Sequence, residues 1–132
     1  MPDFVPTVVV VAAIIESDGR FLLSRRLAGT HLAGAWEFPG GKCEPGESHE
    51  ACLTREIREE LDVDAVVGEE VLTVEHAYPD RHVRLHFRRC AIAGTPSAML
   101  GQELRWVTRA ELGSMDVPPA DRALVERLTR GE

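Results

Sequence analysis

Three glutamates near the middle of the 132-residue chain, Glu56, Glu59 and Glu60, have a spacing that could bind a cation. On a helix, positions i, i+3 and i+4 share one face, so their carboxylates would lie side by side. Each like-charged pair costs about a few tenths of a kcal/mol on an isolated helix, so the cluster favours a bound cation. Carboxylate oxygens suit Mg²⁺ or Mn²⁺, which also bind phosphates. The alternative is a solvated acidic face with Arg55 and Arg58 as partners.

The element that must position these glutamates is a predicted helix over residues 48–61. Leu53, Ile57 and Leu61 recur every four residues, which is helical spacing, and Ser48 is a good residue to cap the start. The segment before it, WEFPGGKCEPGE at residues 36–47, joins aromatic residues to a Pro-Gly-Gly turn. We therefore expect a rigid turn that leads directly into the glutamate helix.

The rest of the chain alternates between strands and helices. An Asp-Gly turn between the apolar runs TVVVVAAII and FLLSRR predicts a hairpin of the two runs. Strand-like composition continues at residues 65–78, 82–94 and 103–107, and helices are predicted within residues 108–115 and 118–131. The second of these carries an apolar stripe of Leu124, Val125 and Leu128. The pattern is α+β, a mixed sheet with at least one helix on each side.

The length, charge and cysteine content of the chain exclude several classes of protein. The length predicts one domain over residues 1–132, and the net charge of −7 argues against binding a nucleic acid polymer or an anionic membrane. No apolar stretch approaches the roughly twenty residues that span a bilayer. The three cysteines, Cys43, Cys52 and Cys90, fit neither a disulfide framework nor a zinc ribbon, so we expect a reduced, cytoplasmic setting. A monomer is the simplest expectation for this short acidic chain.

The spacing around the glutamates matches a longer pattern. Gly41, five residues, Glu47, seven residues and then REIREELDV at residues 55–63 resembles the signature of the Nudix hydrolases, which cleave nucleoside diphosphates linked to another moiety. The match has one exception, because Asp62 stands where the family has Gly. That Gly adopts a left-handed conformation at the helix end, which Asp tolerates better than most residues. We therefore expect an intact site at a small cost in stability.

Segments outside the signature resemble one branch of this family. SRR, WEFPGGK, PDRHVRLHF and VPPADRALVERL follow the order found in the MutT branch, the nucleotide-pool diphosphatases and their cytidine-nucleotide relatives. The resemblance implies the Nudix fold, an α/β/α sandwich around a mixed sheet. It also implies hydrolysis of a nucleoside triphosphate to monophosphate and pyrophosphate by water attack on the β phosphorus. In this branch the reaction serves DNA repair by removing oxidised nucleotides.

The resemblance assigns roles to individual residues. It implies that Glu56, Glu59 and Glu60, with the backbone carbonyl of Gly40, hold Mg²⁺, or Mn²⁺ in its place. Glu47 is expected to pair with Arg55 and orient the glutamates, and a direct role for Glu47 as metal ligand or base stays open. The glutamate that accepts the proton is also left open.

One position departs from the branch. Relatives place a Glu in a Glu-x-Gln segment before the last strand, and Leu100 stands there in this chain. Glu103 lies one residue past the Gln, where the alternation of a strand can point it elsewhere. The number of metal ions is therefore open.

Base recognition is expected at Asp121, which follows Pro-Pro-Ala, where the branch has an Asn or Asp that reads the base. The alternative is an acid that favours the N-terminal dipole of a helix. An ionised carboxylate only accepts hydrogen bonds, so it suits the amino group of cytosine or the N7–H of 8-oxoguanine. The main hypothesis is therefore an 8-oxo-dGTP diphosphatase, and the alternative is a pyrophosphohydrolase of CTP or 5-substituted dCTP.

Two further residues, Arg26 and His31, match positions that contact the nucleotide in the branch. Phe38 could offer its backbone or ring to the base, and Arg81 lies in the PDRH turn, which could line the base pocket. Their alternatives are a surface arginine, a loop histidine, a core aromatic and a turn residue. His76 and His86 are interpreted as structural, because neither has metal-ligand company at a useful spacing.

Two other functions are alternatives to this hypothesis. A non-hydrolysing nucleotide-binding module would be free to lose the glutamates, all of which are present, so hydrolysis is favoured. A diphosphatase of a dinucleoside polyphosphate or nucleotide sugar is disfavoured by the Pro-Pro-Ala-Asp segment.

Overall fold

The computed structural model describes residues 5–131. A four-stranded mixed sheet has the order β5-β1-β7-β6 and consists of β5 (Gly40–Lys42), β1 (Thr7–Ile14), β7 (Arg81–Ala93) and β6 (Asp64–Tyr78). In it β1 runs parallel to β7 and antiparallel to β5, while β6 and β7 form an antiparallel hairpin. The mixed sheet expected from the sequence is confirmed.

A second, antiparallel sheet is built around β3 (Arg20–Arg25), which pairs with β2 (Glu16–Ser17), β4 (Trp36–Glu37) and β8 (Leu104–Thr108). Asp18 and Gly19 both have positive φ, 51° and 74°, as a two-residue hairpin turn requires. The hairpin is much shorter than predicted, because only β2 pairs with β3 across this turn. The first apolar run pairs instead with β5 and β7 in the other sheet.

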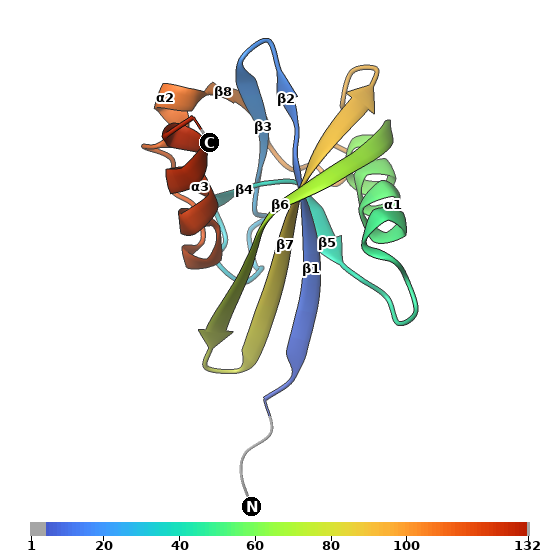
Figure 1. The fold of residues 1–132 in the computed structure, drawn as a ribbon, viewed down its shortest axis with the longest axis vertical. Coiled ribbons are helices and arrows are strands. Elements are labelled where there is room, and N and C mark those ends of the chain that lie inside the picture. Colours follow the sequence, from blue (N-terminus) through green and yellow to red (C-terminus); the bar gives the residue numbers. More distant parts are fainter. Residues whose placement is uncertain (1–4, 132) are drawn as a thin grey trace, which may run out of the picture.

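Helices cover the sheets from opposite sides, as Figure 1 shows. On one side lies α1 (His49–Leu61), and on the other lie α2 (Arg109–Leu112) and α3 (Arg122–Thr129), which follows a short 3₁₀ turn, η1 (Pro119–Asp121). Within residues 5–131, no helix is both long enough and apolar enough to cross a membrane. The arrangement is an α/β/α sandwich.

Strand β1 is continuously apolar because both of its faces are covered. Val11 and Ala13 belong to the buried cluster that contains Leu53 and Ile57 of α1. Ala12 and Ile14, which point the other way, belong to a second cluster with a different set of helical residues, Leu112, Leu124, Val125 and Leu128. The alternation of a strand thus divides one apolar run between two cores.

Helix α1 begins and ends as its sequence predicts. The Ser48 side chain accepts a hydrogen bond from the Ala51 backbone N–H at 3.0 Å, which caps the first turn. At the other end Asp62 adopts the left-handed conformation with φ 55° and ψ 42°, and its N–H donates to the Arg58 carbonyl. The expectation that Asp62 replaces the usual Gly as a left-handed cap is confirmed.

The β6–β7 hairpin is irregular near Glu70. Its register changes between Val67 and Glu70 and again between Glu70 and Leu72. Such a bulge bends a strand and redirects its side chains. Glu70 is therefore the residue whose direction cannot be obtained by counting along the strand.

Replacing Asp62 should test the strain of this cap. A residue with a Cβ is destabilised by about 1–2 kcal/mol in the left-handed conformation. Replacing it with Gly removes this strain, but Gly also raises the conformational entropy of the unfolded chain, which lowers the free energy of unfolding by up to about 1 kcal/mol. We expect Asp62→Gly to raise the free energy of unfolding by about 0.5–1 kcal/mol in urea denaturation. Asp62→Ala, which keeps the Cβ and loses the short polar group, should lower it. A glycine variant no more stable than the wild type would contradict the strain.

Candidate active site

The site begins where β5 passes unusually close to β1 and α1. A Cβ on Gly40 would lie 2.0 Å from the Val11 carbonyl oxygen, and a Cβ on Gly41 would lie 2.3 Å from the carboxyl carbon of Glu56. Gly40 must be glycine because a Cβ there would overlap the backbone of β1, whereas a Cβ at Gly41 would force the Glu56 carboxylate to move. The Gly40 N–H also donates to Glu60 Oε2 at 3.1 Å. These contacts hold the glutamate face of α1 against the edge of the sheet.

Arg55 is the cation at the centre of this acidic cluster. Its Nε and one terminal nitrogen each donate to a Glu47 carboxylate oxygen at 2.8 Å, a bidentate pair. The other terminal nitrogen lies 2.9 Å from Glu56 Oε1 and 3.3 Å from Glu59 Oε2. The expected contact between Glu47 and Arg55 is present, and it fixes Arg55 between three carboxylates.

The carboxyl groups of the cluster differ in the direction of their pKa shifts. Hydrogen bonds from Arg55 lower the pKa of Glu47 to about 2. Burial raises the pKa of Glu56, although Arg55 opposes this shift. Burial, with the charges of Glu56 and Glu37 beside it, raises the pKa of Glu60 to about 8. The cluster therefore carries more carboxylate than Arg55 can neutralise.

These carboxylates fit a hard divalent cation. The donor set is oxygen only, and Glu59, with 55% of its side chain exposed, is free to turn toward an ion. Gly41 makes room for the Glu56 carboxylate, because a Cβ there would lie 2.3 Å from its carboxyl carbon. A cation among these carboxylates would offset the repulsion that, together with burial, raises the pKa of Glu60.

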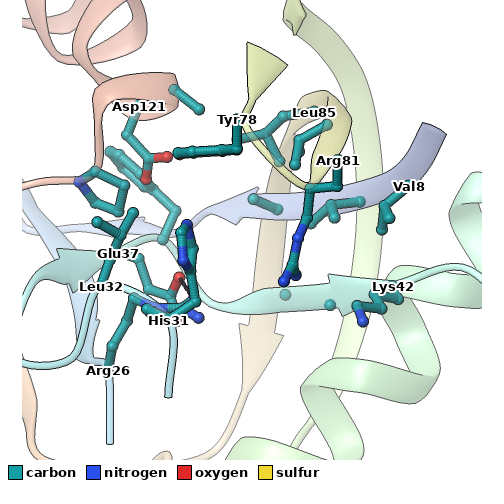
Figure 2. Close-up of a pocket in the computed structure, with 18 of the residues that line it drawn as sticks. Val8, Arg26, His31, Leu32, Glu37, Lys42, Tyr78, Arg81, Leu85 and Asp121 are labelled. Carbon is teal, nitrogen blue, oxygen red and sulfur yellow. Dashed lines mark hydrogen bonds and ion pairs between the residues drawn. The ribbon is translucent and has the colours of Figure 1, made fainter. Parts of the chain in front are cut away.

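A pocket of about 300 Å³ extends from this cluster across the sheet. Gly40, Gly41 and Glu60 line it near α1. Figure 2 shows Asp121 and Tyr78 at one end and Val8 and Lys42 at the other, with Arg81 reaching in from the start of β7. The pocket thus joins the glutamate cluster to the 3₁₀ turn before α3.

All five residues expected to contact a nucleotide, namely Arg26, His31, Phe38, Arg81 and Asp121, line this pocket. The His31 ring packs edge-on against Tyr78, with centroids 4.7 Å apart. Phe38 is also a core residue, since only 3% of it is exposed and its ring packs against Phe87. Phe38 is therefore a core residue that also lines the pocket, and its contact with a nucleotide stays a prediction.

Asp121 is buried, with 5% of its surface exposed. Burial, together with the charge of Glu37, raises its pKa to about 7, although the Phe38 backbone N–H and Arg26 oppose this shift. The sequence analysis treated this carboxyl as ionised, whereas its burial favours the protonated form. Near neutral pH the group is divided between an ionised form that only accepts and a protonated form that accepts and donates.

Two pocket residues escaped the sequence analysis. Glu37 lies 2.7 Å from Arg26 in a half-buried ion pair, and its charge raises the pKa of both Glu60 and Asp121. Tyr78 is the last residue of β6, and its phenol has a raised pKa because it is buried. Glu37 lies in the WEFPGGKCEPGE segment at residues 36–47, so the sequence did show an acidic residue close to the predicted site.

Leu100 stands where the branch has a Glu, so this position supplies no carboxylate. The Leu100 side chain is apolar, and 52% of the residue is exposed. The nearby Gln102 is buried and donates to the Glu60 backbone carbonyl at 3.0 Å. Glu103 points elsewhere and pairs with Arg25 at 3.3 Å. Glu103 therefore does not take the place of the missing acid.

Comparison with known proteins gives consistent likenesses. A family model described as NUDIX domain matches residues 10–127. The chain is 44% identical to a CTP pyrophosphohydrolase of Escherichia coli (strain K12) over 118 residues, covering 89% of this chain and 87% of that protein. It is 32% identical to an 8-oxo-dGTP diphosphatase of the same organism over 123 residues, covering 92% and 95%. The solution structure of the E. coli ORF135 protein superposes with a TM-score of 0.84 at 41% identity, covering 96% of this chain and 91% of that chain.

The raised pKa of Asp121 predicts a pH-dependent stability. The folded chain holds a proton that the unfolded chain loses near the ordinary pKa of 3.8, so this stabilisation is present below about pH 4 and is lost as pH rises through about 7. Between these limits, wild type should lose about 1–4 kcal/mol more unfolding free energy than Asp121→Asn.

The measurement is urea denaturation without divalent metal at a series of pH values. Asp116→Asn, which changes an exposed aspartate a few residues earlier, serves as the matched control and should follow wild type. Parallel pH profiles for wild type and Asp121→Asn would exclude the raised pKa.

Proposed function

The chain belongs to the Nudix hydrolase family, and on that premise we propose that it is a Mg²⁺-dependent diphosphatase of nucleoside triphosphates. The α/β/α sandwich around a mixed sheet, expected from the resemblance, is confirmed. The chain is similar over most of its length to enzymes named for two nucleotides, CTP and 8-oxo-dGTP. The substrate proposed here is a nucleoside triphosphate of one of these two kinds.

The observation that carries the proposal is the continuity of the pocket. The same 300 Å³ cavity is lined by Glu60 and Gly40 near α1 and by Asp121 and Tyr78 beside η1. A nucleotide lying in it would place its phosphates at the glutamates and its base at Asp121. Lys42 and Arg81, which also line the pocket, supply positive charge along the path of the phosphates.

The metal residues are proposed from chemistry and geometry. Glu56, Glu59 and Glu60 would hold Mg²⁺, or Mn²⁺ in its place, with the backbone carbonyl of Gly40. When bound, the ion would neutralise phosphate charge and lower the pKa of a water. Arg55 keeps Glu56 and Glu59 together, and Glu47 in turn fixes Arg55. Water attack on the β phosphorus would give a nucleoside monophosphate and pyrophosphate.

The proposed base reader is Asp121, and in its partly protonated state it would suit two bases. Cytosine presents an amino donor beside the N3 acceptor, and 8-oxoguanine presents an N7–H donor beside the O6 acceptor. Undamaged guanine presents two acceptors on that edge, N7 and O6. A protonated carboxyl has one donor and one acceptor, so it pairs with either of the first two edges and leaves guanine with an unmatched lone pair.

An 8-oxo-dGTP diphosphatase and a cytidine triphosphate pyrophosphohydrolase are therefore both supported. The first stays the main proposal, with nucleotide-pool sanitation as its role. The second is favoured by the 44% identity with a CTP pyrophosphohydrolase.

Removing one glutamate should separate hydrolysis from folding. Glu59 is exposed on α1, so Glu59→Gln should leave the melting temperature close to wild type while kcat with Mg²⁺ falls by about 10²-fold or more. Pyrophosphate release with an 8-oxo-dGTP and CTP panel measures this loss. Glu50→Gln, an exposed glutamate on the first turn of the same helix, is the matched control and should keep full activity. Equal losses in both variants would argue against a specific metal role.

Substrate selectivity tests the assignment of Asp121. Wild type should cleave 8-oxo-dGTP and CTP with a kcat/KM at least about 10²-fold above that for dGTP, because a buried lone-pair mismatch rejects strongly. Asp121→Ala, which removes the polar edge, should reduce this ratio toward one. Steady-state kinetics with 8-oxo-dGTP, dGTP, CTP, dCTP and 5-methyl-dCTP give the ratios. A ratio unchanged in Asp121→Ala would place base recognition elsewhere in the pocket.

A further inference from the structure

A second group of metal-binding side chains lies away from the pocket. The sequence analysis interpreted His86 as structural because no metal-ligand residue lies at a useful spacing along the chain, but the fold brings His49 and Glu70 to it. His49 is the first residue of α1, Glu70 lies at the bulge of β6, and His86 lies in β7. The three are separated by 21 and 16 residues, so sequence spacing could not reveal them.

The three side chains are already close enough to share an ion. One ligand atom from each lies within 4.8 Å of the other two. Ligands about 2.1 Å from one zinc ion are at most about 4.2 Å apart, so small side-chain rotations would suffice. The rings of His49 and His86 have centroids 4.2 Å apart, and His86 Nδ1 lies 2.7 Å from Glu70 Oε1. An ion would replace this last hydrogen bond.

Neighbouring groups hold the ligands in place. The Thr73 hydroxyl donates to Glu70 Oε2 at 3.0 Å and lies 3.2 Å from His86 Nδ1. Only 12% of the His86 side chain is exposed, whereas Glu70 is 40% exposed and open to solvent. Oriented carboxylates and a solvent-facing side are what a site with three protein ligands and a water needs.

The charges around the cluster do not exclude a cation. Arg88 is the nearby positive group, but its Nε donates to the Gly68 carbonyl at 3.0 Å and its terminal nitrogen lies 3.8 Å from Glu50. Glu50, next to His49, offsets the charge of Arg88. Glu70 therefore remains available to balance a bound ion.

We propose that His49, Glu70 and His86 form a binding site for a borderline transition-metal ion, with Zn²⁺ the best fit. Two imidazoles and one carboxylate suit Zn²⁺ and disfavour Mg²⁺, whereas the glutamates of α1 show the opposite preference. His49 precedes Glu56 by seven residues, about 10 Å along the helix axis, so the two sites are separate. The ion ties the start of α1 to the β6–β7 hairpin, and this inference does not depend on the proposed hydrolysis.

The test is calorimetric titration of the full chain with Zn²⁺ while Mg²⁺ is in large excess to occupy oxygen-only sites. Wild type should bind one Zn²⁺ per chain, and His86→Gln and His49→Gln should each weaken this binding by at least about 10-fold, since loss of even an outer partner costs that much. His82→Gln, which changes an exposed histidine on the same strand as His86, is the matched control and should bind as wild type.

The remaining outcomes decide the proposal. His49 lies at a helix start on the surface, so His49→Gln keeps the test valid where His86→Gln fails to fold by circular dichroism. No Zn²⁺ binding by wild type overturns the site. Equal affinity in wild type and His49→Gln overturns it as well, and so does Zn²⁺ binding that is lost only in Cys43→Ser, because Cys43 lies near Cys52 and offers thiol ligands.

Discussion

The close approach of β5 to the β1 backbone at Gly40, and to the Glu56 carboxylate at Gly41, is the constraint on which the site depends. With a Cβ at either position, β5 would collide with the Val11 carbonyl or with the Glu56 carboxylate. Because no Cβ is there, the Gly40 N–H reaches Glu60, and the glutamate face of α1 becomes the wall of a pocket. The buried Leu53 and Ile57 on the adjoining face of α1 then fix the rotation of the helix about its axis. The packing of the apolar face of α1 and the lack of side chains at Gly40 and Gly41 thus together orient the glutamate carboxylates toward the pocket.

That arrangement concentrates negative charge beyond what the chain neutralises. Arg55 makes its short contacts with Glu47 and Glu56 and reaches Glu59, while the Glu60 carboxylate accepts a hydrogen bond from the Gly40 N–H. The pKa of Glu60 is raised because burial and the nearby carboxylates of Glu56 and Glu37 act on it. Local electrostatic strain of this kind is typical of binding sites, where a ligand or ion completes the charge balance.

Features that depend on neighbouring residues in the chain were predicted from the sequence, whereas strand pairing and the effects of burial were not. The cap at Ser48, the left-handed Asp62 and the apolar stripe of α3 follow from short-range rules, and all are present. The partner of β1 was mispredicted because a buried strand with two covered faces carries no signal for its neighbours. The protonation of Asp121 depends on burial by segments distant in sequence, and the position of Glu70 depends on a bulge that no residue type announces. Sequence spacing therefore predicted the glutamate cluster, which lies on one helix, but not the cluster of His49, Glu70 and His86, which comes from a helix and two strands.

Glu37 links the two ends of the pocket, and this has a consequence for the ligand. Its charge raises the pKa of Glu60 at one end and of Asp121 at the other, and Arg26 is its ion-pair partner at 2.7 Å. A bare triphosphate entering a pocket with Glu37, Glu60 and Asp121 would be repelled, even with Lys42 and Arg81 beside it. A triphosphate that arrives with its divalent cation carries less negative charge and brings the positive charge that the glutamates lack. The proposed nucleotide would therefore suit the charges of this pocket better as a complex with a divalent cation than alone, because the cation would neutralise both the phosphates and the glutamates.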